Sequence, residues 1–379
     1  MGRSEIFWTN ARDYLTAQTP ERPVLFFSSQ KLHQAAEGFL SGFPGLVTYA
    51  VKANPAGEVL ANLMAAGIRA FDVASPQEIE AVRALMPEAE LHYNNPVRSR
   101  SEIRLAVRHR VKSYSVESHS ELAKLAELVP TDGVEVAVRF KLPVAGASYD
   151  FGSKFGATPD AAAELLRQVA GLGFVPSLTF HPGTQCVEAE AWVAYIKAAG
   201  DICQRAGVDI ARLNVGGGFP SHRSGVAPDH GRIFEAIEQA TRDTFGEMAP
   251  SLLCEPGRAM VAEAYALGVR VKAVRDDRDI FLNDGIYGAL AEFPLLGALS
   301  RMRIISAEGV VRAGPLIKRP VFGPTCDSVD RLPDGVALPS DLAEGDYLII
   351  EGMGAYSTVT NTRFNGYGDY QIVDTARFF

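Results

Sequence analysis

Lys52 and His181 are the first residues whose surroundings in the sequence suggest chemistry. Lys52 stands in the apolar run Tyr-Ala-Val-Lys-Ala-Asn-Pro at 49–55. A charged amine in an apolar strand is costly unless it is paired or used, and a desolvated lysine can form Schiff bases. His181 begins His-Pro-Gly-Thr at 181–184, and its imidazole could be a base, a ligand or a flat stacking surface. Taken singly, an ion-paired lysine and a hydrogen-bonded loop histidine explain these residues better.

Two glycine-containing stretches add candidate groups for binding an anion. Gly216, Gly217 and Gly218 are consecutive, and they either let backbone N–H groups approach a phosphate or form a tight turn. Glu255 and Arg258 are three residues apart, and they could serve a ring nitrogen and a phosphate or form a structural salt bridge. Together with the lysine and the imidazole, these are the parts that a pyridoxal phosphate site needs.

The candidate residues lie at the ends of predicted strands in a repeating strand–helix pattern. The eight predicted strands are Leu46–Ala53, Ala70–Val73, Leu91–Tyr93, Ser113–Val116, Val134–Phe140, Ser177–His181, Arg212–Val215 and Leu252–Glu255. Between them, apolar residues recur every three or four positions, and Ser75, Ser118 and Thr158 are predicted helix caps. Eight repeats predict an α/β fold with a (β/α)8 TIM-like barrel, since a doubly wound sheet needs fewer strands. Active sites of such barrels lie at the carboxyl ends of the strands.

The pattern divides the chain into three predicted parts. Residues 1–40 form an N-terminal segment, which we expect to pack with the C-terminal domain, and residues 41–260 form the barrel. Residues 261–379 form a mainly antiparallel β domain, because Gly and Pro punctuate short strands there and no long helix intervenes. The predicted strands outside the barrel are Val24–Phe27, Tyr265–Val274, Asp279–Asn283, Met302–Ile305, Pro320–Phe322 and Tyr347–Glu351.

Composition argues against several classes of partner. The chain has 379 residues with 37 basic and 45 acidic side chains, so a nucleic-acid partner is not expected. No apolar run approaches the roughly 20 residues of a membrane helix, so no membrane partner is expected either. The four cysteines lack Cys-x-x-Cys spacing, which disfavours a zinc ribbon and a thioredoxin-like pair, and a disulfide framework is not expected in a chain this long. We therefore expect no metal and a cytoplasmic location.

The motifs, taken in order, resemble those of the fold type III pyridoxal-phosphate decarboxylases, the alanine-racemase-like barrel enzymes. The similarity is greatest to the ornithine/lysine/arginine decarboxylase branch. The matching stretches are YAVKANP (49–55), FDVAS (71–75), FHPGTQ (180–185), NVGGGFP (214–220), EPGR (255–258), DGIYG (284–288), FGPTCDSVD (322–330), EGMGAYS (351–357) and RFNGY (363–367). The resemblance implies pyridoxal 5'-phosphate as cofactor and decarboxylation of a basic L-amino acid. Ornithine (product putrescine) is expected before lysine (product cadaverine), in polyamine biosynthesis.

The same resemblance implies roles for residues of the barrel. Lys52 would carry the cofactor as a Schiff base, and Asp72 and Arg139 would brace the region around it. His181 would stack on the pyridine ring, and Glu255 would pair with the ring nitrogen. The residues implied to surround the phosphate are Thr184, Gly217, Gly218, Arg258 and Tyr356.

The β domain would supply the substrate end of a site shared within a homodimer. In this family the Cys-Asp motif reaches the active site of the partner subunit. Cys326 would return a proton to Cα, and Asp327 would bind the distal ammonium of a diamino acid. Tyr287, Glu292 and Phe364 are the further residues that we expect to contact the substrate.

One departure from the family pattern concerns that distal amine. Diamine-forming members carry a Tyr-Asp pair where gap-free counting places Leu295 and Leu296, and Glu292 is the nearby acid that would have to substitute. A diaminopimelate substrate is disfavoured, because Asp327 would repel its terminal carboxylate. The alternatives are a decarboxylase of another amino acid, an amino-acid racemase and a non-catalytic regulatory homologue. A racemase needs a tyrosine base where this chain offers Cys326, and a regulatory homologue would have lost cofactor residues that this chain keeps.

Overall fold

The computed structural model describes residues 7–143, 154–297, 300–333 and 335–379. The chain forms two compact units. The barrel unit comprises Ala36–Pro220 and Pro228–Met260, and the β unit comprises Met1–Ala35, Ser221–Ala227 and Val261–Phe379. The short segment Ser221–Ala227 thus leaves the barrel sequence and belongs to the β unit, which the sequence pattern does not predict.

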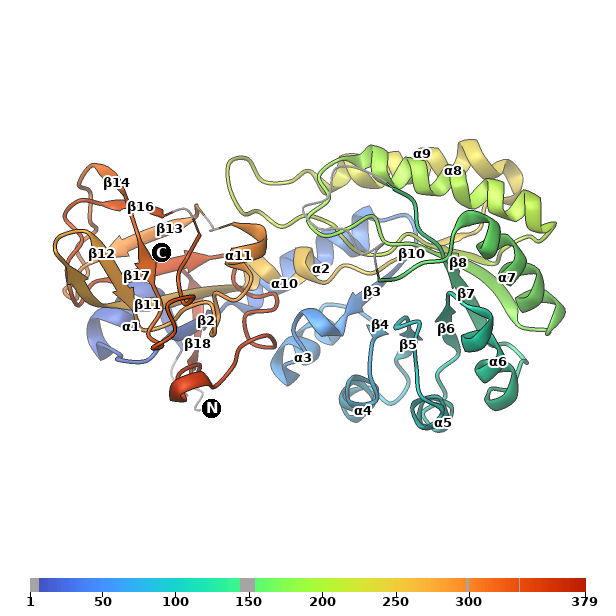
Figure 1. Ribbon diagram of the computed structural model, residues 1–379, viewed down its shortest axis with the longest axis horizontal. Coiled ribbons are helices and arrows are strands. Elements are labelled where there is room, and N and C mark those ends of the chain that lie inside the picture. The colour runs from blue at the N-terminus through green and yellow to red at the C-terminus, as the bar shows by residue number, and fades with distance from the viewer. Residues whose placement is uncertain (1–6, 144–153, 298–299, 334) are drawn as a thin grey trace. The chain divides into compact units, whose positions relative to one another are not determined.

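A closed barrel of eight parallel strands forms the centre of the barrel unit, as predicted (Figure 1). In chain order the strands are β3 (Leu46–Ala50), β4 (Ala70–Val73), β5 (Glu90–Tyr93), β6 (Ser113–Val116), β7 (Glu135–Arg139), β8 (Val175–Thr179), β9 (Arg212–Asn214) and β10 (Ser251–Cys254). The barrel closes through parallel pairing of β10 with β3. Five of the predicted strands extend one to three residues too far at the carboxyl end, because the chain turns there to form the loops of that face.

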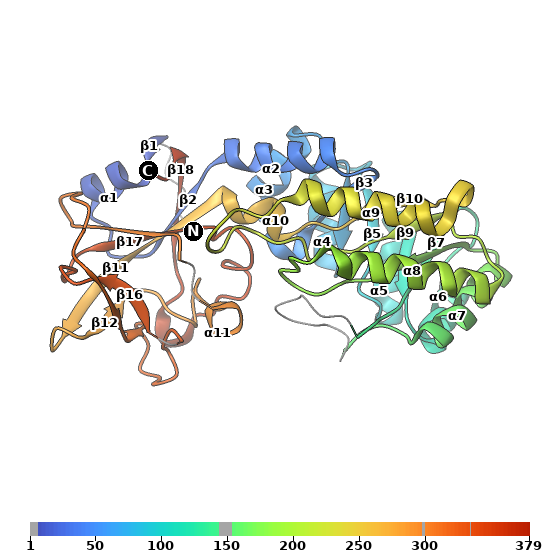
Figure 2. The same cartoon turned by 90° about the horizontal axis from the view of Figure 1, so that it is seen from above.

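Helices alternate with these strands and surround them (Figures 1 and 2). They are α3 (Gly57–Ala65), α4 (Pro76–Leu85), α5 (Arg100–Arg108), α6 (His119–Leu128), α7 (Pro159–Gly171), α8 (Ala189–Ala206), α9 (His230–Phe245) and the short α10 (Arg258–Val261). α2 (Ser29–Gly42) precedes β3, and the 3₁₀ turns η1 (Val51–Ala53) and η2 (Gly246–Met248) follow β3 and α9. The side chains of Ser75, Ser118 and Thr158 accept backbone N–H groups three residues later, which confirms the predicted caps.

The β unit contains a mixed sheet of eight strands. They are β1 (Trp8–Asn10), β2 (Val24–Phe27), β11 (Tyr265–Arg275), β12 (Asp279–Leu282), β13 (Met302–Ile305), β15 (Val321–Phe322), β17 (Tyr347–Glu351) and β18 (Gln371–Arg377). β14 (Leu316–Arg319) and β16 (Val336–Pro339) form a separate antiparallel pair. The remaining elements are α1 (Ala11–Gln18), α11 (Phe293–Leu296), and the 3₁₀ turns η3 (Ala262–Ala264) and η4 (Phe364–Gly366).

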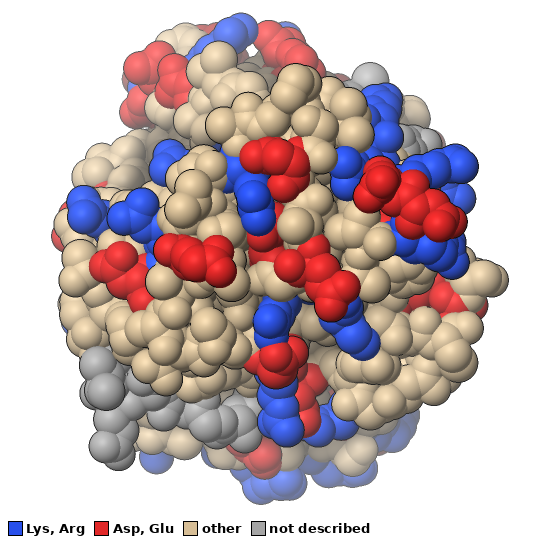
Figure 3. Space-filling model, turned by 90° about the vertical axis from the view of Figure 1, so that its left-hand side faces the viewer, with Lys and Arg blue, Asp and Glu red and all other residues tan. Residues whose placement is uncertain are grey.

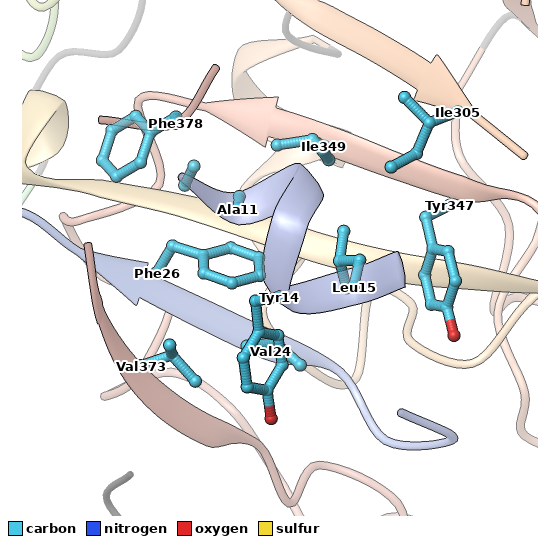
Figure 4. Close-up of a cluster of buried hydrophobic side chains, with 11 residues drawn as sticks. Ala11, Tyr14, Leu15, Val24, Phe26, Ile305, Tyr347, Ile349, Val373 and Phe378 are labelled. Atoms are coloured by element: carbon cyan, nitrogen blue, oxygen red, sulfur yellow. The ribbon is translucent and has the colours of Figure 1, made fainter. Parts of the chain in front are cut away.

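The N-terminal strand β2 lies inside this sheet. It pairs antiparallel with β11 and parallel with β18, which begins more than 340 residues later in the chain. Buried side chains of α1 pack on the sheet in Figure 4, where the rings of Tyr14 and Phe26 meet edge to face with centroids 5.6 Å apart. The Tyr14 hydroxyl also donates to Gln371 Oε1 at 2.7 Å. The two ends of the chain therefore form one core.

The surface and the helices carry two further observations. On the face drawn in Figure 3, basic and acidic side chains of the described residues are interspersed. In the part of the chain that the structure describes, none of the helices combines the length and the apolar character needed to cross a bilayer.

Candidate active site

Lys52 lies in the turn η1, directly after β3, and the prediction that it lies within the strand is wrong. The strand ends at Ala50, whose N–H donates to the Pro256 carbonyl at 3.1 Å. The turn exposes 45% of the Lys52 side chain, so burial does not set its chemistry. Its Nζ lies 3.4 Å from Oδ2 of Asp72, a buried residue of β4. The site therefore presents an accessible amine beside a carboxylate.

Glu255 supplies a buried carboxylate immediately after β10. Its Oε1 accepts hydrogen bonds of 2.5 Å from Nδ2 of Asn94 and from Nδ2 of Asn214. Burial raises the pKa of Glu255, and the charge of Asp72 raises this pKa further. A buried acid with a raised pKa would be stabilised as an anion by a nearby cation.

His181 and Arg139 lie at the same ends of neighbouring strands. His181 Nδ1 accepts the N–H of Gly183 at 3.1 Å, so this ring nitrogen carries no proton. Burial lowers the pKa of His181 well below its ordinary value, and the positive charges of Lys52 and Arg139 lower it further. Burial also lowers the pKa of Arg139. His181 is therefore a neutral, flat ring, which suits stacking better than ion pairing.

The three glycines form a turn that accepts no side chain. Gly216 and Gly218 have φ of 70° and 86°, which glycine adopts readily. A Cβ at Gly217 would lie 2.6 Å from the Glu255 carbonyl oxygen, and one at Gly218 would collide with the Gly183 carbonyl oxygen. The turn thus requires glycine, because neighbouring backbone occupies the space that a side chain would need.

Thr184 and Arg258, the other barrel residues expected near a phosphate, differ in their burial. Thr184 is half-buried in the loop after β8, whereas Arg258 is 8% exposed and begins α10. The Arg258 guanidinium adds a cation to the groups already described, which are the glycine turn, the accessible amine, the neutral ring and the buried acid. These groups fit pyridoxal phosphate.

Three of the predicted substrate residues meet in the β unit. The Tyr287 hydroxyl donates to Oδ2 of Asp327 at 2.5 Å, and the rings of Tyr287 and Phe364 have centroids 5.1 Å apart. The N–H of Val329 donates to Oδ1 of Asp327 at 2.9 Å. The hydrogen bond with Tyr287 lowers the pKa of Asp327 and raises that of Tyr287. Cys326, the residue before Asp327, is exposed and forms no disulfide. An accessible thiol therefore adjoins the Asp327 carboxylate in sequence.

The departure from the family pattern is visible around α11. Leu295 and Leu296 lie within this short helix, and their N–H groups donate to the Glu292 carbonyl at 3.0 and 2.9 Å. The Leu295 side chain is 70% exposed.

Tyr356, which the resemblance places near the phosphate, lies elsewhere in the β unit. It has a φ of 64°, a conformation that is rare for a bulky residue and costs energy.

Three residues that hold parts of the candidate site in place were not predicted from the sequence. Asn94 and Asn214 bind the Glu255 carboxylate, and both stand at the carboxyl ends of strands, where the barrel rule directs attention. Asp330 is 1% exposed and accepts hydrogen bonds from Ile286 N–H and from the N–H and hydroxyl of Thr325. It stands inside a matched motif, but only the fold reveals that its carboxylate braces the loop.

Comparison with known proteins finds a matching family model, related sequences and similar solved structures. The family model for the pyridoxal-dependent decarboxylase, pyridoxal binding domain, matches residues 29–262. The chain is 30% identical to ornithine decarboxylase of Rattus norvegicus over 350 residues, covering 84% of this chain and 73% of the relative. It is 31% identical to lysine/ornithine decarboxylase of Selenomonas ruminantium over 338 residues, covering 85% and 81%. The crystal structure of the Paramecium bursaria Chlorella virus arginine decarboxylase bound to agmatine is similar, with a TM-score of 0.86, 25% identity and coverage of 96% and 98%.

Proposed function

Because the chain belongs to the family of pyridoxal-dependent decarboxylases, we propose that it removes the α-carboxylate of a basic L-amino acid. Ornithine is the first candidate and lysine the second. The choice of a basic amino acid rests on the Asp327 carboxylate, whose pKa is lowered by the hydrogen bond from Tyr287. A carboxylate that stays ionised attracts a distal ammonium and repels a distal carboxylate.

The barrel residues account for the binding of the cofactor. Pyridoxal phosphate, when bound, supplies an aldehyde that combines with amines and a ring that withdraws the electrons left by departing CO2. Lys52 is the amine that holds it, and Asp72 orients that amine at 3.4 Å. Glu255 would keep a proton on the ring nitrogen, and the neutral ring of His181 would stack on the pyridine ring. The residues that would hold the phosphate are Thr184, Gly217, Gly218, Arg258 and Tyr356.

The β unit supplies the groups that act on the substrate. Asp327 binds the distal ammonium, Tyr287 keeps the Asp327 carboxylate in place, and Phe364 packs on the Tyr287 ring. Cys326 returns a proton to Cα after CO2 has left. We propose a homodimer in which each site combines Lys52 of one subunit with Cys326 of the partner subunit.

The products follow from the substrates. Ornithine gives putrescine and lysine gives cadaverine, so we propose a role in polyamine biosynthesis in the cytoplasm. Because Leu295 and Leu296 replace the second acid of the family, Asp327 is the principal anchor, and Glu292 assists only if the loop rearranges. One methylene in a pocket is worth about 1–3 kcal/mol, so both diamino acids should be accepted.

Asp327→Ala tests the substrate class. The assay compares kcat/KM for ornithine with that for norvaline, which has the same chain length but no distal amine. The wild type should prefer ornithine strongly, and Asp327→Ala should reduce this preference by at least about tenfold. Asp341→Ala, which changes an exposed acid whose carboxylate accepts the Gly314 N–H, is the control. An equal loss for ornithine and norvaline would contradict the proposal.

A further inference from the structure

Two buried amides hold the Glu255 carboxylate in the barrel unit. Nδ2 of Asn94, the residue after β5, and Nδ2 of Asn214, the last residue of β9, each lie 2.5 Å from Glu255 Oε1. Asn94, Asn214 and Glu255 are 9%, 3% and 7% exposed. Hydrogen bonds to a charged acceptor are stronger than those between neutral groups, so these contacts fix where the carboxylate lies.

The orientation of the Asn214 amide is settled by its second partner. Asn214 Oδ1 accepts the N–H of Gly216 at 2.8 Å, and a backbone N–H can only donate. The NH2 group of Asn214 therefore faces Glu255, whose Oε1 can only accept. Any proton that Glu255 carries must then be on Oε2.

The charge state of Glu255 depends on opposing effects. Burial and the charge of Asp72 raise the pKa of Glu255. The charges of Lys52 and Arg139 and the hydrogen bond from Asn214 lower this pKa. Loss of the amide donors would shift Glu255 toward the neutral acid. A neutral acid would donate its own proton to a ring nitrogen, whereas an anion keeps a proton on the ring.

We propose that Asn94 and Asn214 are positioning residues that hold Glu255 as an anion and leave Oε2 for the protonated ring nitrogen of the cofactor. They act through Glu255 and need not touch the cofactor themselves. Asn214 also links the acid to the glycine turn at 216–218, because the Gly216 N–H donates to Asn214 Oδ1 and the Gly216 carbonyl accepts the Glu255 N–H at 2.9 Å. This inference rests on the proposed function, since it concerns the binding of pyridoxal phosphate.

The test compares the affinity of the full chain for pyridoxal phosphate with that for its 1-deaza analogue, in which a C–H group replaces the ring nitrogen. The two probes share the aldehyde and the phosphate, so their dissociation constants, measured by equilibrium dialysis, isolate the ring nitrogen. Asn94→Leu removes one donor at similar volume. Asn214→Asp keeps an acceptor for the Gly216 N–H but replaces the other donor with a second acid. Asn62→Asp makes the same change in α3, where the amide donates to the Glu58 carbonyl at 2.8 Å, and serves as the control.

The wild type and Asn62→Asp should prefer pyridoxal phosphate to the analogue, and Asn94→Leu and Asn214→Asp should each lose about tenfold of this preference. An unchanged preference in Asn94→Leu and Asn214→Asp would overturn the inference, even if both affinities fall, because a merely structural role weakens both probes equally. If one variant does not fold, as judged by circular dichroism, the other decides the outcome. Failure of the wild type to bind either probe would instead refute the proposed function.

Discussion

Asp330 should stabilise the β unit through the loop that carries Cys326 and Asp327, and Asp330→Asn tests this role. The Asp330 carboxylate accepts three hydrogen bonds: Ile286 N–H donates to Oδ1 at 3.0 Å, and the N–H and hydroxyl of Thr325 donate to Oδ2 at 3.1 and 2.8 Å. Both oxygens are therefore used as acceptors in a site that is 1% exposed.

The magnitude follows from counting acceptors. An asparagine keeps one oxygen, so its best orientation retains the two bonds from Thr325 and turns an NH2 group toward the Ile286 N–H. That orientation loses one hydrogen bond to a charged acceptor, which is worth about 1.5–3 kcal/mol. The side chain cannot move away, because it packs tightly against the backbone of Gly285 and Gly323. We therefore expect the free energy of unfolding to fall by about 2–3 kcal/mol.

Urea denaturation followed by circular dichroism measures this change. Asp341→Asn is the matched control, because the Asp341 carboxylate is exposed and accepts the Gly314 N–H at 2.9 Å; a surface change of this kind costs within about 0.5 kcal/mol. If Asp330→Asn and Asp341→Asn lower the free energy of unfolding equally, the reasoning is refuted. A loosened loop should also raise KM for a diamino acid in Asp330→Asn.

Three further predictions address the cofactor, the dimer and the pH dependence. Lys52→Ala should abolish the absorbance band of the bound cofactor, and persistence of the band would remove Lys52 from its proposed role. Mixing the inactive variants Lys52→Ala and Cys326→Ala should restore up to about a quarter of the activity if C2-related subunits share sites; no recovery despite proven subunit exchange would place both residues in one chain's site. Burial raises the pKa of Asp284 from 3.8 to about 7, so the unfolded carboxyl ionises first and stability falls as pH rises between these values. Asp284→Asn should remove this contribution, and an unchanged slope of unfolding free energy with pH between about pH 4 and pH 7 would contradict it.

The barrel could be predicted from the sequence because its determinants are local. Short apolar runs followed by polar or glycine residues mark the strands, and caps such as Ser75 mark where the helices begin. All eight predicted strands are in the barrel. The 3₁₀ turn at Lys52 was missed, because Tyr-Ala-Val-Lys-Ala has the apolar character of a strand. In the fold, the Asn54 N–H donates to the Val51 carbonyl and closes the turn.

The elements that escaped prediction depend on partners distant in the sequence. β18 pairs with β1 and β2 at the other end of the chain, and the short strands β14 and β16 form a separate antiparallel pair. The same limit applies to the site. Asn94 precedes Glu255 by 161 residues and Asn214 precedes it by 41, so nothing local indicates that the two amides bind one carboxylate oxygen.

The most direct test of the proposed function is CO2 release by the chain loaded with pyridoxal phosphate, with ornithine, lysine, arginine, 2,4-diaminobutyrate and diaminopimelate offered in parallel. We expect ornithine or lysine to give the highest rate, with the diamine as the other product. If neither is decarboxylated but another amino acid is, Leu295 and Leu296 mark a different specificity, and the proposed role of Asp327 as the ammonium anchor for these substrates is contradicted.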